Sequence, residues 1–157
     1  MPKFTKSIDI STSPERVFDF VSKLDSTEYA KLNMIEMKVE KITKGKTAKG
    51  TIFHFSNKVP GMSKSLEQDS EMLEWDPPKK FTTMVKNGPL KGTTFEYKVE
   101  EKGNGGTKFK GTVDFKMNDS LEGISEKDAF QLLDKQWDEF VKRLKSVLEK
   151  NKENDRQ

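Results

Sequence analysis

The sequence contains no cysteine and only one histidine, His54, among its 157 residues. Without cysteine, the chain cannot form disulfides, use a thiolate nucleophile or bind a metal through thiolates. A single histidine also excludes the multi-histidine sets that often hold zinc. We therefore expect no metal and no cofactor.

Long apolar runs are also missing. No stretch approaches the roughly 20 apolar residues that a membrane-spanning helix needs. The start, Met-Pro-Lys-Phe, lacks the apolar run of a signal peptide. These absences predict a cytoplasmic, soluble protein with no stable membrane insertion.

The chain also lacks a large excess of either charge, because 29 basic residues and 26 acidic residues leave a net charge of only +3. The basic and aromatic residues fall on opposite faces of the expected strands, whereas single-strand nucleic-acid platforms need them together. We therefore expect no nucleic-acid partner. The 11 Phe, 7 Met and 2 Trp supply bulky apolar groups and favour one folded domain, residues 1–157, over disorder.

The most regular pattern lies at 125–150, where apolar residues recur at steps of three and four, as on one face of an α-helix. Such a helix would be about 37 Å long at about 1.5 Å per residue. Ser125 and Asp128 resemble a capping box at its start. An apolar stripe of this length needs a concave partner. It consists of Phe130, Leu133, Trp137, Phe140, Val141, Leu144, Val147 and Leu148.

The rest of the chain supplies that partner. A strand is expected at 4–10, then a helix that Ser13 caps and Pro14 begins, then a second short helix that ends near Leu32. Residues 151–157 lack apolar positions and are expected to fray. The fold class is therefore α+β: a curved antiparallel sheet of about seven strands around the long helix, with two short helices after the first strand. The further strands are expected near 34–42, 50–56, 64–75, 80–86, 93–101 and 106–117.

Four features in this order resemble the START-like, or SRPBCC, superfamily. They are SPERVF at 13–18, GTIF at 50–53, EWDPPKKF at 74–81 and the terminal amphipathic helix. The resemblance implies a helix-grip fold with an elongated apolar cavity between sheet and helix. It implies no single activity, since the superfamily includes lipid carriers, polyketide cyclases and chaperone-activating domains without a shared catalytic motif. Tyr29 stands in the short-helix region where many members have Trp.

The leading hypothesis is binding of a hydrophobic or amphipathic small molecule (a lipid, polyketide or aromatic compound) in that cavity. A cyclase or dehydratase that uses Tyr97 or His54, and a protein-interaction module resembling the chaperone activators, are the alternatives. No protein partner can be named. The candidate lining residues are Phe53, Phe55, Met72, Phe81, Phe95, Tyr97, Phe109, Phe115, Phe130, Leu133 and Trp137.

Single polar residues have two interpretations each. His54 lies opposite Phe53 and Phe55 by strand parity, so it faces solvent if they face the cavity, unless a bulge exchanges the faces. The alternating acids of 67–71 favour a solvated face over a metal site. The Tyr97 hydroxyl could orient a ligand or bond a core carbonyl. Three segments, 57–64, 87–92 and 118–125, could gate the cavity or serve as plain connections.

Overall fold

The computed structural model describes residues 2–119 and 121–155, with side chains described as far as residue 150. The chain begins with β1 (Lys3–Ile10), α1 (Pro14–Ser22) and α2 (Thr27–Ala30). A meander of strands follows and ends in a 30-residue helix, α3 (Glu126–Asp155). The meander consists of β2 (Met37–Lys41), β3 (Ile52–Asn57), β4 (Leu66–Asp76), β5 (Lys80–Val85), β6 (Thr94–Glu101), the 3-10 turn η1 (Gly103–Gly105) and β7 (Thr107–Asp114).

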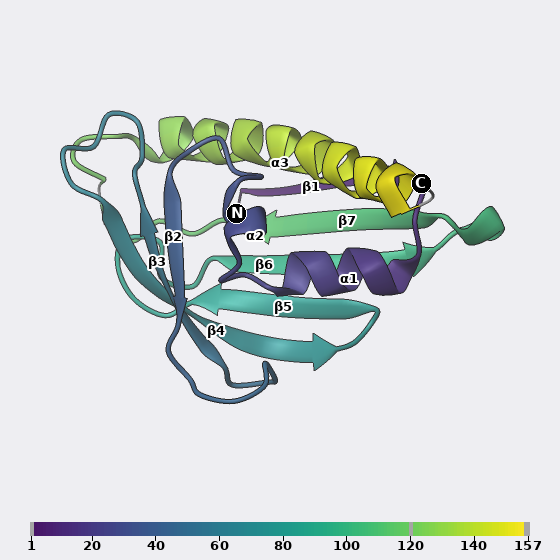
Figure 1. The fold of residues 1–157 in the computed structure, drawn as a ribbon. Helices are drawn as coiled ribbons and strands as arrows, with labels where there is room; N and C mark the ends of the chain where they lie inside the picture. The colour runs from purple at the N-terminus through teal and green to yellow at the C-terminus, as the bar shows by residue number, and fades with distance from the viewer. Residues whose placement is uncertain (1, 120, 156–157) are drawn as a thin grey trace.

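The strands form one antiparallel sheet of seven strands in the order β1-β7-β6-β5-β4-β3-β2. The first strand therefore pairs with the last, and every other pair is a hairpin neighbour. α3 runs along β1 and β7, while β2 and β3 turn toward its N-terminal half from the other end of the sheet (Figure 1). The predicted α+β helix-grip fold is confirmed.

Serine side chains fix where the helices begin. The hydroxyl of Ser13 accepts from the Arg16 N–H, and that of Ser26 accepts from the Tyr29 N–H. The Ser125 hydroxyl accepts from the Asp128 N–H at 3.0 Å, as the capping pattern predicts. α3 extends to Asp155, into the segment expected to fray, and residues 156–157 of that segment lie outside the described residues.

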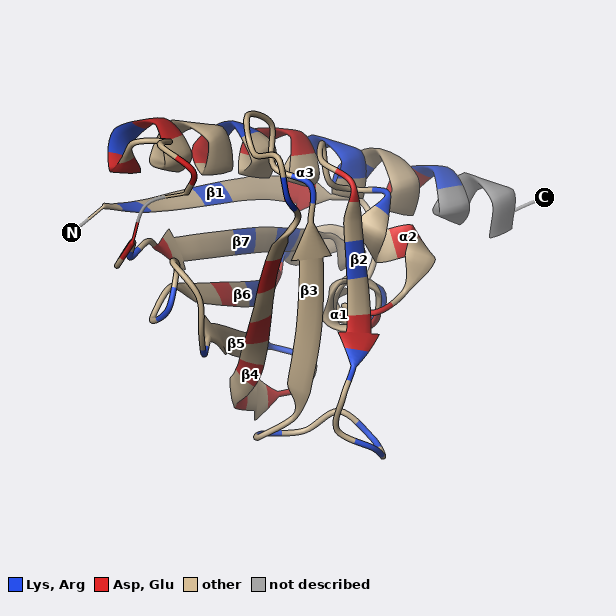
Figure 2. Ribbon diagram, turned by 90° about the vertical axis from the view of Figure 1, so that its left-hand side faces the viewer, with Lys and Arg blue, Asp and Glu red and all other residues tan. Residues whose placement is uncertain are grey.

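The outer face of the sheet carries the charges. Acidic positions alternate with uncharged ones along β4, as Figure 2 shows. Glu71 pairs with Lys86 at 2.7 Å, and Asp69 accepts from the Asn87 amide at 3.0 Å. This period of two places the acids on the solvated face and leaves the intervening residues for the interior.

The interior contains two apolar clusters along α3. The larger one fills the space between the sheet, α1 and the C-terminal half of α3, around Val17, Phe109 and Leu144. The smaller one lies under the first turns of α3, around Phe115 and Leu121. The two clusters define a closed end and an open end of the grip, and the cavity lies between them.

Trp137 seats α3 on the sheet above Gly111 of β7. A Cβ built at Gly111 would overlap the Trp137 ring, so a side chain there cannot coexist with this position of the indole. The ring also lies 4.9 Å from Phe140 and 5.5 Å from Tyr97, measured between centroids. The missing side chain in β7 thus sets how closely the helix approaches the sheet.

Candidate ligand cavity

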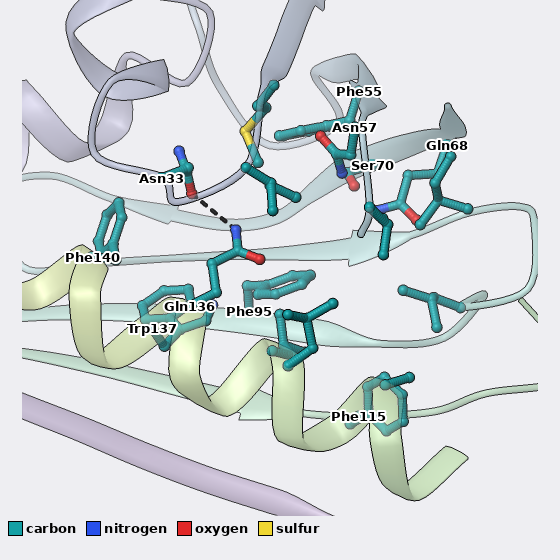
Figure 3. A pocket seen from close by; sticks show the side chains of 18 of the residues that line it. Asn33, Phe55, Asn57, Gln68, Ser70, Phe95, Phe115, Gln136, Trp137 and Phe140 are labelled. Carbon is teal, nitrogen blue, oxygen red and sulfur yellow. Dashed lines mark hydrogen bonds between the residues drawn. The ribbon is translucent and has the colours of Figure 1, made fainter. Parts of the chain in front are cut away.

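A cavity of about 110 Å³ lies between α3, the inner face of β3–β6 and the loops before α3. Its volume is of the order of the roughly 150 Å³ engineered cavity that holds benzene, and below the roughly 300–1,000 Å³ common for larger ligands. Its apolar lining is Leu24, Ile35, Met37, Phe55, Val59, Leu66, Leu90, Phe95, Phe115, Leu121, Ile124, Ala129, Leu132, Leu133, Trp137 and Phe140. Its polar lining is Tyr29, Asn33, Asn57, Gln68, Ser70, Thr83, Tyr97 and Gln136. Figure 3 labels Asn33, Asn57, Gln68, Ser70 and Gln136 among them.

None of these described lining residues is a lysine, arginine, aspartate, glutamate or histidine. Burying an ionised side chain without a partner costs several kcal/mol, roughly, because the charge loses its hydration. Such a group often becomes neutral instead. The cavity is therefore suited to a neutral molecule.

Two tyrosines form a closed polar pair at the α2 side of the cavity. The hydroxyls of Tyr29 and Tyr97 lie 2.7 Å apart. Burial raises the pKa of each phenol, so both keep their protons at neutral pH. Because the two hydroxyls bond to each other, the pair favours a structural role for Tyr97, with an apolar ring surface left for a ligand.

Asn33 and Gln136 tie the segment after α2 to α3. The Gln136 amide donates to the Asn33 side-chain oxygen at 3.1 Å, the contact drawn dashed in Figure 3. The Asn33 amide in turn donates to the carbonyls of Tyr29 and Ala30. Arg143 adds a bond to the Asn33 carbonyl at 3.0 Å. This side of the cavity is fixed by bonds that the protein makes with itself.

The opposite wall differs. Asn57 at the end of β3 and Gln68 in β4 are 7% and 6% exposed, and the side-chain oxygen of each lacks a hydrogen-bond partner among the described residues. Both belong to the cavity lining, across from α3 in Figure 3. Asn57 pairs with Leu66 and Gln68 with Phe55, so the two amides share the inner face as diagonal neighbours.

The predicted lining residues fall into two groups. Phe55, Phe95, Tyr97, Phe115, Leu133 and Trp137 come together at the cavity. The others lie elsewhere. For the six residues at the cavity, a role in ligand binding stays a prediction. For the other five, the structure gives no geometric support for such a role.

The second group fills the closed parts of the fold. Phe53, Met72, Phe81 and Phe109 are fully buried in the larger cluster. Phe81 packs under α1, with its ring 5.6 Å from that of Phe18. Phe130 points to the smaller cluster, between Phe4 and Phe115. These residues face inward like the first group, but they lie at positions along their strands or helix where the inner face is covered by other side chains. Only part of the inner face borders the cavity.

Sequence reasoning missed the polar members of the lining other than Tyr97. Gln68 and Ser70 alternate with the acids of β4 and therefore share the inward parity of Met72. Asn57 likewise continues the parity of Phe53 and Phe55 in β3. Polar residues at inward positions of an otherwise apolar face were the available signal.

His54 lies on the outer face, as the parity of Phe53 and Phe55 indicates. Its Nδ1 is 2.7 Å from the Asp69 carboxylate, and its Nε2 is 3.8 Å from that of Glu67. The bond to Asp69 raises the pKa of His54, against a smaller opposing effect of burial. The bulge in β4 falls between Met72 and Glu74, beyond the stretch that faces His54.

The loops at the open end are held to one another. Glu122 accepts hydrogen bonds from the N–H groups of Ser63, at 2.9 Å, and Lys64, at 3.3 Å, and from the Ser63 hydroxyl. These bonds lower the pKa of Glu122. Asn118 ties the 118–125 segment to the 87–92 segment, because its N–H donates to the Pro89 carbonyl and its side-chain amide donates to the Lys91 carbonyl. All three segments expected at the cavity edge thus form one connected rim.

The fold and the cavity define a helix-grip protein with a partly enclosed, mainly apolar cavity. The chain matches, over residues 1–149, the family described as polyketide cyclase / dehydrase and lipid transport, and it belongs to that family. This confirms the resemblance found in the sequence. No curated protein matches the sequence.

Solved structures share the fold at low sequence identity. The protein TTHA0849 from Thermus thermophilus matches with a TM-score of 0.74 at 17% identity, over 94% of this chain and 97% of that one. A START superfamily protein from Mycobacterium smegmatis gives 0.74 at 14% identity, with coverages of 94% and 97%. The Zhui aromatase/cyclase from Streptomyces sp. R1128 gives 0.73 at 13% identity, with coverages of 99% and 96%. These similarities establish the fold alone.

No helix among the described residues is long and apolar enough to cross a membrane.

Proposed function

We propose that this protein binds a neutral, mainly apolar small molecule between α3 and the inner face of the sheet. The observation that carries the proposal is the partly enclosed cavity itself, whose described lining is mostly aliphatic and aromatic and contains no charged side chain. Apolar pockets with a few placed polar groups are the usual form of small-molecule sites. Met37 gives part of the wall an adaptable side chain that could make room for a longer ligand.

Binding is better supported than turnover. An acid–base mechanism needs a group whose pKa lies near the working pH. His54, whose pKa the Asp69 carboxylate raises, lies on the outer face, and the two cavity tyrosines remain protonated. The lining can therefore bind a molecule, but it provides few groups for proton transfer. Zhui is named an aromatase/cyclase, which keeps cyclisation as the second candidate.

An interaction module has less support. Among the described residues, the large hydrophobic side chains that are exposed are Met34 and Ile42. Protein-binding surfaces usually show a contiguous apolar patch of several hundred Å², roughly. Two side chains are too few to form such a patch, whereas the cavity lining is contiguous.

Calorimetric titration with toluene, naphthalene and 1-decanol tests the proposal, together with native mass spectrometry of the purified protein. We expect saturable 1:1 binding of at least one probe. Leu133→Trp should fill the cavity and abolish that binding. Leu73→Trp is the matched control, because Leu73 is half-buried and does not line the cavity. A protein that carries no small molecule and binds none of the probes up to their solubility would contradict the proposal.

A further inference from the structure

Two buried amides in the cavity wall have hydrogen-bonding capacity that the fold does not use. Asn57 and Gln68 are more than nine-tenths buried, and the side-chain oxygen of each is unpaired among the described residues. An unsatisfied buried polar group costs about 1–3 kcal/mol. Most such groups in proteins have a partner, so an unpaired pair at one site calls for an explanation.

Four other polar residues of the lining show the contrast. Tyr29 pairs with Tyr97, and Gln136 pairs with Asn33, in each case within the protein. Gln68 stands opposite Phe55 and Asn57 opposite Leu66, so the cross-strand neighbour of each amide is apolar. The sheet itself therefore provides no partner for the oxygen of either amide.

The spacing of the two amides allows them to act on one group. Diagonal neighbours of this kind have Cα atoms about 7–8 Å apart. Side-chain amides that project from such positions into a common space can both reach a single oxygen atom placed between them. Ser70, two residues beyond Gln68 and also in the lining, places a hydroxyl on the same face.

The chemistry of the amides selects the ligand group. A carboxylate has no proton to donate to an amide oxygen, and an ammonium would be buried in a described lining that holds no charge to balance it. A hydroxyl both donates and accepts, so it satisfies a carboxamide through its oxygen or through its NH₂. A hydroxyl has one proton, so it can donate to the oxygen of one amide and accept from the NH₂ of the other, which makes it the smallest neutral group that serves both.

We propose that Asn57 and Gln68 form a recognition site for a hydroxyl group of the ligand, which makes that ligand a neutral, mainly apolar alcohol or phenol. The apolar body lies against Trp137, Phe95 and Leu133, and the hydroxyl points to the end of β3. This inference rests on the proposed function and narrows its ligand class.

Four small probes of one scaffold test the site: toluene, p-cresol, 4-methylanisole and 4-methylbenzoate. In the wild-type protein, we expect p-cresol to bind more tightly than 4-methylanisole, which keeps the oxygen but lacks the proton, and 4-methylbenzoate not to bind. Gln68→Met should lower the affinity for p-cresol by about 3- to 10-fold, which corresponds to the loss of one hydrogen bond. The affinity for toluene should stay the same or rise. Gln131→Met, at an exposed position of α3, is the control and should change neither affinity.

The outcomes separate the two proposals. Binding of toluene with the same p-cresol-to-toluene ratio in wild type, Gln68→Met and Asn57→Leu would overturn the hydroxyl site and leave the apolar cavity standing. Failure of every probe to bind wild type would overturn both. The comparison of p-cresol with 4-methylanisole needs only wild-type protein, so it tests the hydroxyl site even if a variant fails to fold. Equal affinity for the two probes would overturn that site.

Discussion

The two halves of α3 make different use of the same apolar stripe. Toward its C-terminus, Leu144 and Leu148 are fully enclosed by the sheet and α1. Toward its N-terminus, Leu133 and Trp137 border the cavity, and loop residues rather than α1 lie beside this half of the helix. One helix therefore serves as a structural anchor at one end and as the wall of a binding site at the other.

The largest expected effect contrasts two identical substitutions on this helix. Leu144→Ala removes a fully buried side chain and should lower the free energy of unfolding by about 3 kcal/mol or more. Leu133→Ala should cost about 1 kcal/mol, because its side chain is half-buried and already borders open space. Urea denaturation measures both. Equal costs would mean that the two ends of α3 are packed alike.

A second test acts where the halves meet. Gly111→Ala should displace the Trp137 ring and destabilise the protein by about 2 kcal/mol, a typical cost of overpacking. Toluene affinity should change as well, because Trp137 lines the cavity. The control is Gly103→Ala, where an added Cβ meets nothing within 4 Å. If both variants kept wild-type stability and affinity, Gly111 would not seat the helix.

A third prediction runs opposite to the usual effect of core mutation. Gln68→Met removes an unpaired buried oxygen at nearly constant volume, so we expect the free energy of unfolding to rise by about 1 kcal/mol. The variant should still bind toluene. Gln131→Met should stay within about 0.5 kcal/mol of wild type. A clear loss of stability in Gln68→Met would show that the amide is satisfied within the folded protein.

The smallest expected effect lies outside the grip, on the outer face of the sheet. Because the folded pKa of His54 is raised above its usual value of 6.5, its contribution to stability is fully present below about that pH and is lost as pH rises through the raised pKa. The pair is partly exposed, so we expect less than about 1 kcal/mol. His54→Gln should remove this pH dependence in urea denaturation and leave toluene affinity unchanged. A changed affinity would contradict the separation of the two faces.

The sequence predicted the fold because its patterns are local and regular. The period of 125–150, the Ser13 and Ser125 caps and the strand alternation all correspond to observed elements. Parity also placed His54 on the face opposite Phe53 and Phe55, and the structure shows that these two phenylalanines take the inner face.

The cavity was less accessible from the sequence. Parity assigns a residue to the inner face, but whether that face meets another side chain or open space depends on packing far along the chain. Phe81 is covered by Phe18 of α1, whereas Phe95 in the adjacent strand borders the cavity. The rim contact between Glu122 and Ser63 likewise joins segments 59 residues apart, which no local pattern reveals.

The most direct test follows Trp137 during ligand binding. In a Trp75→Phe variant, Trp137 is the remaining tryptophan of the chain, since the sequence has 2. Titration with toluene, which absorbs little at the red edge of the indole band, should produce a saturable one-site change in fluorescence. Leu133→Trp added to this chain should abolish calorimetric binding. A fluorescence signal that does not change up to the solubility of toluene, with no heat of binding, would contradict the proposal that this grip holds an apolar ligand.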